Sequence, residues 1–260
     1  MRILRFSCEC KVRYGLLDRT EVHGLRGTPL SRLKSGPIEF RLDGSCYDLE
    51  YVRLLSPVRP SKIVAVGLNY RSHAEETMMQ LPASPLIFLK PSTAVVGPEE
   101  DIVLPRSSRR VDYEGELGVV IGRKAKDVPR EQAAEYVLGY TCVNDVSERH
   151  FQKVDGQWAR AKGFDTFAPI GPWIETDVDF TGGWLTTKLN GEVRQSACLC
   201  DLIFGVPELV EFVSGVMTLL PGDVISTGTP AGIGPMKAGD VVEVTIDGIG
   251  TLRNRAVAAE

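Results

Sequence analysis

The segment RRVDYEGELGVVIG, residues 109–122, places two acidic residues, Glu114 and Glu116, directly before an apolar run. Alternate residues of a strand point to the same face, so the two carboxylates would project side by side. Adjacent carboxylates repel each other, and burying them unpaired is costly. The segment therefore predicts either a strand that presents two acids to a cation, or an exposed strand edge whose acids pair with Arg109 and Arg110.

Short β-branched or aromatic runs bounded by turn formers recur from residue 62 onward. Examples are KIVAVGLNY at 62–70, YVLGYTCVNDV at 136–146 and DVVEVTIDGIGTL at 240–252. Many strands with few helices predict a mostly β fold of the α+β class, built as a barrel or as packed sheets. Apolar residues recur near helical spacing in only three segments, which are expected to be helical: 70–80, 129–137 and 199–220.

The sequence predicts two domains, with the boundary near residue 60. Short alternating runs before residue 55 predict a small β-rich N-terminal domain, residues 1–58. Pro57 and Pro60 disfavour helix in the residues before them and indicate a linker. Residues 62–260 are expected to form the catalytic domain.

Composition excludes several classes of protein. The 260 residues are 43% hydrophobic and 25% charged, which is typical of a globular protein. A formal net charge of −4 argues against nucleic-acid binding, which favours clustered Lys and Arg. No apolar run approaches the roughly 20 residues of a membrane span, and the first 15 residues are too polar for a signal peptide. A cytoplasmic protein with no membrane or nucleic-acid partner is expected.

The cysteines are expected to be reduced thiols, because a chain of this length without an export signal does not need a disulfide framework. They are Cys8, Cys10, Cys46, Cys142, Cys198 and Cys200. The C-x-C pairs and the three histidines do not have the spacing of a structural zinc site, so none is expected.

A third acid extends the pair on the quoted segment. The apolar run at 136–143 ends in Asn144 and Asp145, and the end of a buried strand is a common place for a functional residue. Three carboxylates without a nearby soft ligand favour Mg²⁺ or Mn²⁺ over zinc. Glu114, Glu116 and Asp145 are therefore the predicted metal ligands.

Several strings occur in the order seen in the fumarylacetoacetate hydrolase family, which the chain resembles from about residue 62 to 254. They are VGLNYRSHAEE, PLIFLKPSTAVVGP, VDYEGELGVVIG, GYTCVNDVSERHFQ, QWARAKGFDTFAPIGPW, LNGEVRQ, LLPGDVISTGTPAGIGP and AGDVVEVTIDGIGTLRN. The resemblance implies the mixed β-sandwich roll of that family, a homodimer, and a bound Mg²⁺ or Mn²⁺. Residues 1–58 resemble the N-terminal extension of many prokaryotic members.

The resemblance also assigns residues. It places the metal on Glu114, Glu116 and Asp145. The founding enzyme has a fourth carboxylate where this chain reads GLNYRSH, so the resemblance implies three carboxylates and an extra water here. It implies that His73 and Glu76, one helical turn apart, activate a water. On spacing alone, such a pair is typical of a surface contact.

The remaining assignments concern Lys162 and the substrate. The resemblance gives Lys162 the role of stabilising developing negative charge, whereas a lone lysine is typically solvated. It also implies a group of substrate-binding residues: Tyr70, Lys90, Arg149, Gln152 and Thr229. For Arg149 and Gln152, ordinary polarity on a helix surface is an equal alternative.

The implied chemistry is that of a Mg²⁺-dependent enzyme whose partner is a small 2-oxo or enol acid and whose intermediate is an enolate. The presence of both His73 and Glu76 favours hydrolytic C–C cleavage of acylpyruvate or fumarylpyruvate-like substrates, with oxaloacetate decarboxylation as a side activity. The alternative is a 2-hydroxyhepta-2,4-diene-1,7-dioate (5-carboxymethyl-2-hydroxymuconate) isomerase of aromatic catabolism. An alternative of another class is a non-catalytic binder of 2-oxo acids.

Overall fold

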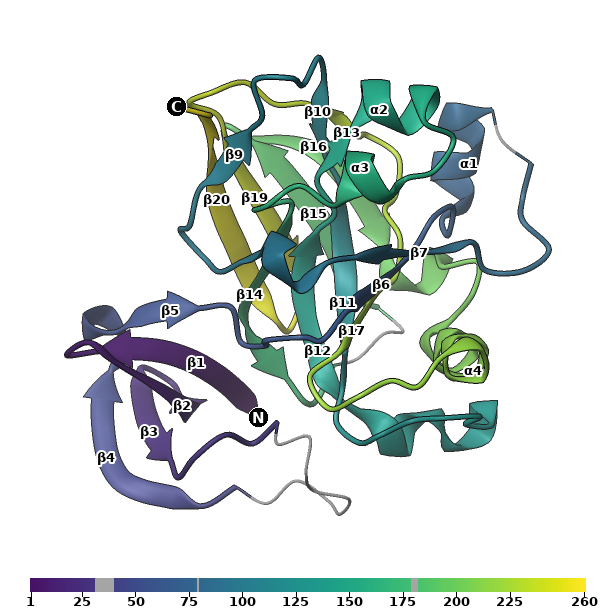
Figure 1. Cartoon of the computed structure of the whole chain (residues 1–260). Coiled ribbons are helices and arrows are strands. Elements are labelled where there is room, and N and C mark those ends of the chain that lie inside the picture. The colour runs from purple at the N-terminus through teal and green to yellow at the C-terminus, as the bar shows by residue number, and fades with distance from the viewer. Residues whose placement is uncertain (31–39, 79, 179–181) are drawn as a thin grey trace.

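The computed structural model describes residues 1–30, 40–78, 80–178 and 182–260 (Figure 1). Three sheets form its framework, as the runs of β-branched residues predict. The largest is twelve-stranded and contains β1 (Arg2–Cys8), β2 (Lys11–Asp18), β3 (Glu21–Leu25), β4 (Leu42–Asp48), β5 (Arg53–Leu55), β6 (Ile63–Val66), β7 (Ile87–Lys90), β8 (Val95–Val96), β11 (Gly115–Ile121), β12 (Val137–Asn144), β14 (Ala168–Glu175) and β17 (Val224–Ser226). Its main path runs β4-β3-β2-β1-β14-β12-β11-β17-β6-β7, with β5 paired to β1 and β8 paired to β14.

Two smaller sheets complete the architecture. The five-stranded sheet has the order β16-β15-β19-β20-β9, and the three-stranded sheet has the order β13-β10-β18. Their strands are β9 (Ile102–Leu104), β10 (Val111–Tyr113), β13 (Ser147–Glu148), β15 (Trp184–Leu189), β16 (Glu192–Cys198), β18 (Gly234–Pro235), β19 (Val241–Ile246) and β20 (Gly250–Ala258). The prediction of a mostly β fold with a few helices is confirmed.

The core lies between the large sheet and the five-stranded sheet. Leu117 of β11 and Cys142 of β12 pack in one buried cluster with Leu185, Val244 and Leu252 from β15, β19 and β20. The apolar side chains on the inner faces of the two sheets thus pack against each other, as in a β-sandwich.

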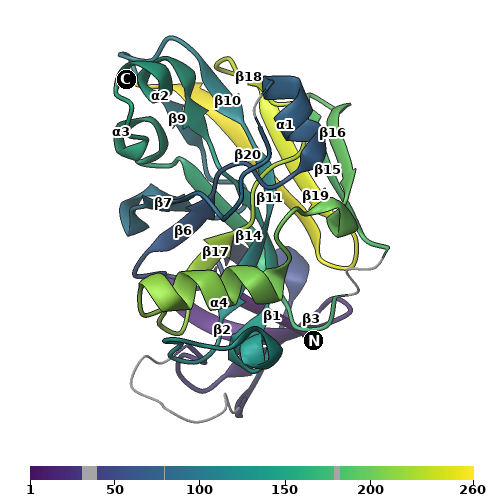
Figure 2. The ribbon, with the colours of Figure 1, turned by 90° about the vertical axis from the view of Figure 1, so that its right-hand side faces the viewer.

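Helix α4 (Val206–Val216) covers another part of the large sheet. Its buried Leu209 and Val213 pack with Val66 of β6, Val119 of β11 and Ile225 of β17. Figure 2 shows the helix lying across these strands. The buried side chains therefore fix the central strands from which the acidic residues project.

Helices α1 (Arg71–Thr77), α2 (Arg149–Val154) and α3 (Ala159–Lys162) gather at the opposite end of the molecule from β1–β4 (Figure 1). The expectation of helix at 70–80 is met by α1 over residues 71–77, and residue 79 lies outside the described residues. The expectation that helices occur only in three segments is wrong, because α2 and α3 lie outside them. Six and four residues are too few to produce a clear helical periodicity in a sequence.

Short 3₁₀ turns account for the other differences in the helical segments. Residues 129–137 form the 3₁₀ helix η3 (Arg130–Tyr136) rather than an α-helix, and residues 199–220 contain η4 (Leu199–Asp201) before α4 begins near Pro207. Pro at the first turn of a helix favours a new start at that point. The remaining 3₁₀ turns are η1 (Leu49–Tyr51) and η2 (Ser92–Ala94).

The N-terminal strands continue the large sheet rather than forming a separate one. Strand β1 pairs antiparallel with β14 through Arg2 opposite Glu175 and Ile3 opposite Ile174. Ile3 is also buried in a cluster that contains Val120 of β11. One of the short alternating runs expected before residue 55 is IEFRLDG at 38–44, and its first two residues lie outside the described residues.

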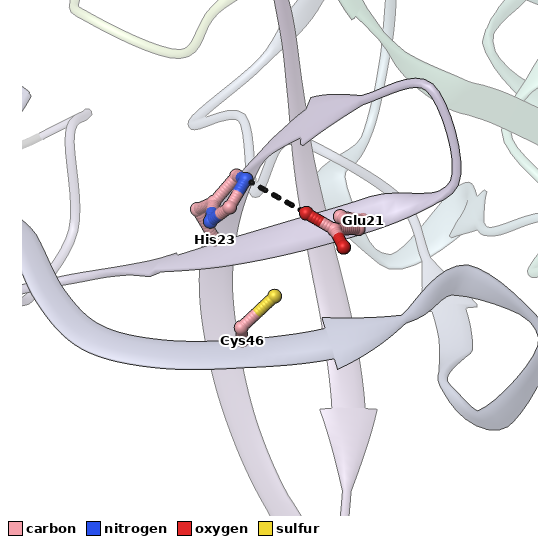
Figure 3. A group of neighbouring side chains, drawn as sticks. All are labelled: Glu21, His23 and Cys46. Carbon is pink, nitrogen blue, oxygen red and sulfur yellow. Dashed lines mark ion pairs between the residues drawn. The ribbon is translucent and has the colours of Figure 1, made fainter.

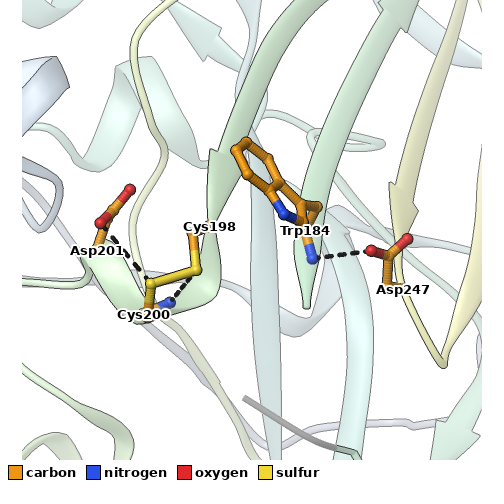
Figure 4. Close-up of a disulfide and its surroundings, with 5 residues drawn as sticks. All are labelled: Trp184, Cys198, Cys200, Asp201 and Asp247. Atoms are coloured by element: carbon orange, nitrogen blue, oxygen red, sulfur yellow. Dashed lines mark hydrogen bonds between the residues drawn. A yellow bond between two sulfur atoms is a disulfide. The ribbon is translucent and has the colours of Figure 1, made fainter. Parts of the chain in front are cut away.

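The prediction that all six cysteines are free thiols is wrong for Cys198 and Cys200, which form a disulfide (Figure 4). Cys198 ends β16 and Cys200 lies in η4, and the turn brings their Cα atoms to 5.1 Å. That separation lies within the usual range of about 4.4–6.8 Å for a disulfide. The other four cysteines are free.

Among the described residues, no helix is long and apolar enough to cross a membrane.

Candidate metal centre and active site

Three carboxylates converge where β11 and β12 end. Glu114 precedes β11, Glu116 lies on it, and Asp145 follows β12. The antiparallel register pairs Gly115 with Asn144, and the Asp145 N–H donates to the Glu114 carbonyl at 2.8 Å. The three acids are buried, and one oxygen from each lies within 4.8 Å of the others. The alternative of an exposed strand edge paired with Arg109 and Arg110 is therefore wrong.

Cationic side chains surround two of the three acids. The Lys162 Nζ donates to Glu114 Oε2 at 2.7 Å and to Asp145 Oδ2 at 2.5 Å. The Lys90 Nζ donates to Asp145 Oδ1 at 2.5 Å, and Arg149 donates to Glu114. Lys162 is therefore not solvated, and it bridges two of the predicted metal ligands.

Glu116 has a different environment. Its Oε2 accepts hydrogen bonds from the Ser226 hydroxyl at 2.5 Å and from the Gly228 N–H at 2.9 Å. Burial, together with the nearby charges of Asp145 and Glu114, raises the pKa of Glu116 well above its ordinary value. A positive charge beside Glu116 would therefore stabilise its ionised form.

The pKa values of the surrounding groups follow from the same contacts. Burial opposes ionisation of Glu114, but the charges of Arg149 and Lys162 outweigh it and lower the pKa of Glu114. Burial also opposes the charge on Lys162, yet Asp145 and Glu114 raise the pKa of that lysine. For Lys90, burial outweighs the attraction of Asp145, and its pKa is lowered.

This donor set fits a hard divalent cation. Three oxygen ligands are held on rigid strand ends, and they have the chemistry that Mg²⁺ and Mn²⁺ prefer. The raised pKa of Glu116 is the specific sign of fit, because a cation beside it would supply the charge that holds this carboxylate ionised.

A cavity of about 620 Å³ opens onto the carboxylates. Seven predicted site residues line it: His73, Glu114, Asp145, Arg149, Gln152, Lys162 and Thr229. Four others, Tyr70, Glu76, Lys90 and Glu116, are not among its lining residues. Tyr70 and Lys90 are fully buried, and their contact with substrate stays a prediction.

His73 and Glu76 form the pair that their spacing predicts. Both lie on α1, with His73 Nδ1 3.0 Å from Glu76 Oε2. The other oxygen of Glu76 accepts the Gly232 N–H at 3.0 Å, which ties α1 to the glycine-rich loop after β17. In a neutral imidazole, the contact favours the tautomer with its proton on Nδ1, which leaves the free lone pair on Nε2.

Arg149 and Gln152 belong to one network on α2. The Arg149 guanidinium donates to Gln152 Oε1 at 2.8 Å and to Asp112 Oδ2 at 2.9 Å, besides its bond to Glu114. Thr229 donates to the Gly115 carbonyl at 2.8 Å. Arg149 is therefore held in place by buried acids, unlike an ordinary surface arginine.

Part of the cavity wall was not predicted from the sequence. Phe88 and Trp158 line it in an edge-to-face contact with ring centroids 5.1 Å apart. Arg109, His150 and Lys153 also line it. The aromatic character of the QWARAK string was the available signal for Trp158, whereas Phe88 looks like an ordinary strand residue.

Comparison with known proteins adds to this geometry. Residues 62–257 match the sequence profile described as fumarylacetoacetate (FAA) hydrolase C-terminal, and residues 1–57 match one described as Rv2993c-like, N-terminal. The chain belongs to the fumarylacetoacetate hydrolase family.

Three similar proteins illustrate the range of this family. Protein Rv2993c of Mycobacterium tuberculosis is 52% identical over 217 residues, which is 82% of each chain. The crystal structure of a 5-carboxymethyl-2-hydroxymuconate delta-isomerase from Mycobacterium smegmatis is 46% identical, with a TM-score of 0.91 and full coverage of both chains. A maleylpyruvate hydrolase from Sphingobium sp. SYK-6, in complex with manganese(II) and pyruvate, is 30% identical, with a TM-score of 0.80 and full coverage of both.

These relatives include enzymes of two reaction types, isomerase and hydrolase. This chain therefore belongs to a family that contains enzymes. It also has a buried triad of carboxylates that could hold a metal ion.

Proposed function

We propose that the protein is a Mg²⁺- or Mn²⁺-dependent enzyme that cleaves a C–C bond of acylpyruvate or fumarylpyruvate-like substrates by hydrolysis, through an enolate. One observation carries the proposal. The metal-suited carboxylates and the paired His73 line or adjoin the same cavity, so that a cation and a general base face one substrate.

Glu114, Glu116 and Asp145 would hold the metal. When bound, the cation supplies positive charge that lowers the energy of an enolate and binds the 2-oxo acid end of the substrate. A maleylpyruvate hydrolase relative that contains manganese(II) and pyruvate supports this use of the site.

The residues of the chain supply the other steps. His73, oriented by Glu76, removes a proton from a water whose oxygen attacks the distal acyl carbonyl. The bond between that carbonyl carbon and the neighbouring methylene then breaks, and its electron pair passes to pyruvate as the enolate. Lys162 contributes positive charge beside this anion. Protonation of the enolate carbon gives pyruvate, and the acyl part leaves as a carboxylic acid.

Arg149, Gln152 and Thr229 would bind and orient the substrate and the water at the cavity wall. Lys90 and Tyr70 would act from behind this wall, Lys90 through its bond to Asp145. Loss of CO₂ from oxaloacetate gives the same enolate without an attacking water, so decarboxylation is the expected side activity.

The second candidate is a 2-hydroxyhepta-2,4-diene-1,7-dioate (5-carboxymethyl-2-hydroxymuconate) isomerase of aromatic catabolism. The 46% identity to a protein of that name from Mycobacterium smegmatis favours it. Isomerisation moves a proton along a dienol and needs no attacking water. His73 and Glu76 would then have less effect on turnover than in hydrolysis.

The test is turnover of acetylpyruvate, oxaloacetate and the muconate-type dienol by purified protein with Mg²⁺ or Mn²⁺. We expect cleavage of acetylpyruvate, and its loss in His73→Ala. Arg71→Ala, an exposed change on the same helix, is the matched control and should keep the activity.

Each other outcome has a distinct meaning. Full cleavage by His73→Ala would remove that residue from its role. Turnover of the dienol alone would favour the isomerase. No turnover of any substrate, with binding of a 2-oxo acid, would favour a non-catalytic binder.

We also propose that the chain works as a cytoplasmic homodimer with an N-terminal domain at 1–58 and a catalytic domain at 62–260. The two profile matches, to 1–57 and 62–257, support the division of the chain. Light scattering on the purified protein tests the dimer, and a monomer at assay concentration would contradict it.

A further inference from the structure

A second group of potential metal ligands lies on the N-terminal strands, outside the catalytic cavity. Glu21 and His23 are on β3, and Cys46 is on the neighbouring strand β4. Figure 3 shows the three side chains on one face of these strands, with the sulfur of Cys46 pointing toward the other two. One ligand atom from each lies within 4.8 Å of the others.

The strand register explains why these residues meet. His23 lies directly opposite Cys46 in the antiparallel pair of β3 and β4. Glu21 is two residues before His23 and therefore points to the same face. The intervening Val22 points to the other face, where it is buried in an apolar cluster with Phe6. The pairing of the strands therefore places the three side chains next to one another on the same face.

The spacing of His23 and Glu21 is close to that of tetrahedral coordination. Zinc bonds of about 2.0 to 2.2 Å to a nitrogen and an oxygen, at a tetrahedral angle, place those two atoms roughly 3.3 to 3.6 Å apart. His23 Nε2 and Glu21 Oε2 are 3.7 Å apart. Cys46 is a free, exposed thiol, so a metal can reach it from solvent.

The charges on this face supply an independent reason for a cation. Glu21 lies opposite Asp18 on β2 and opposite Asp48 on β4. Like charges directly opposite each other across strands are destabilising. Three acids in one row beside His23 therefore form a local negative field that a divalent cation would relieve.

We propose that Glu21, His23 and Cys46 bind Zn²⁺, with water in the fourth position. Thiolate and imidazole ligands select zinc over Mg²⁺, whereas the all-carboxylate catalytic triad has the opposite preference. The chain thus has two metal sites of different softness. Spacing along the sequence did not predict this one, because 22 residues separate His23 from Cys46 and only the strand register brings them together.

Cobalt(II) distinguishes the two sites, because only a cysteine-containing site gives a thiolate-to-cobalt charge-transfer band in the near ultraviolet. Full-length protein is freed of metal, reduced, saturated with Mg²⁺ at the carboxylates, and titrated with Co²⁺. We expect the band to appear and then to disappear when Zn²⁺ displaces the cobalt. Zn²⁺ affinity, measured by competition with a chromophoric chelator, should fall at least about tenfold in His23→Ala.

Cysteine variants identify the thiol. Cys46→Ser should abolish the band, whereas the exposed Cys10→Ser and the double variant Cys198→Ser/Cys200→Ser should retain it. Thermal unfolding without metal shows that each variant is folded. Absence of the band in wild type, its persistence in Cys46→Ser, or unchanged Zn²⁺ affinity in His23→Ala would each overturn the proposal.

Discussion

Replacement of Lys162 by Met should lower the stability of the metal-free protein, raise its affinity for the metal and abolish hydrolysis. The buried ammonium lies between Glu114 and Asp145, at 2.7 and 2.5 Å from their oxygens. Removing one partner of a buried ion pair costs about 3 to 5 kcal/mol, because the remaining charges are left uncompensated. A protein of this size loses roughly 2 to 4 °C of Tm per kcal/mol, so metal-free Lys162→Met should melt roughly 10 °C lower.

The same change should strengthen metal binding. The ammonium contacts two oxygens of the carboxylate triad and therefore opposes binding of a second cation there. Coulomb's law gives about 3 kcal/mol for two unit charges 5 Å apart at an effective dielectric of about 20. Mn²⁺ should consequently bind Lys162→Met at least about tenfold more tightly and recover much of its lost Tm. Hydrolysis should nevertheless be lost, because the charge beside the enolate is gone.

The assay is thermal unfolding with and without Mn²⁺, together with Mn²⁺ titration calorimetry and acetylpyruvate turnover. Lys153→Met, which removes an exposed lysine at the cavity wall, is the control for a general loss of positive charge. Weaker Mn²⁺ binding by Lys162→Met than by wild type would refute the reasoning that this lysine and the metal share two carboxylates.

Two further predictions concern the elements that support the site. Burial opposes ionisation of Glu148, but hydrogen bonds from three backbone N–H groups, that of Phe151 first, outweigh it and lower its pKa from 4.5. The stability that the ionised Glu148 contributes is present above pH 4.5 and is lost as pH falls through the lowered pKa. Glu148→Gln should therefore lower the free energy of unfolding by about 2 kcal/mol at pH 7 and by less in thermal unfolding at acidic pH. A loss of stability that does not depend on pH would contradict this prediction. Gly232 has φ +99°, and an added Cβ would lie 2.0 Å from the Arg194 carbonyl oxygen. Gly232→Ala should therefore lower the free energy of unfolding, measured by chemical denaturation, by at least about 1 to 3 kcal/mol and reduce hydrolysis, whereas Gly215→Ala, whose added Cβ meets open space, should do neither. Equal activity of the two variants would argue against the link from this loop to Glu76.

The three acids proposed as metal ligands were the most predictable part of the site. Glu114 and Glu116 share a strand face by simple alternation, and Asp145 ends an apolar run, so local patterns were sufficient to group them. Their countercharges were not predictable in this way. Lys90 comes from β7 and Lys162 from α3, and only the packed fold shows that both contact Asp145.

The short helices show a second limit of sequence patterns. Helix α2 begins after Glu148, whose carboxylate accepts the Phe151 N–H at 2.6 Å as an N-terminal cap. Six residues give this helix too little periodicity to be distinguished from a loop. The mostly β class, in contrast, depends on many repeated runs, and an error in one of them does not change the result.

The pairing of β1 with β14 has a consequence for any attempt to shorten the chain. Without residues 1–57, the end of β14 at Ile174 and Glu175 would lose its neighbour and expose unpaired backbone amides and carbonyls. Ile3 would also leave an apolar hollow against Ile174. An exposed edge strand of this kind can pair with strands of other molecules. The truncated protein should therefore self-associate and precipitate rather than behave as a smaller soluble enzyme.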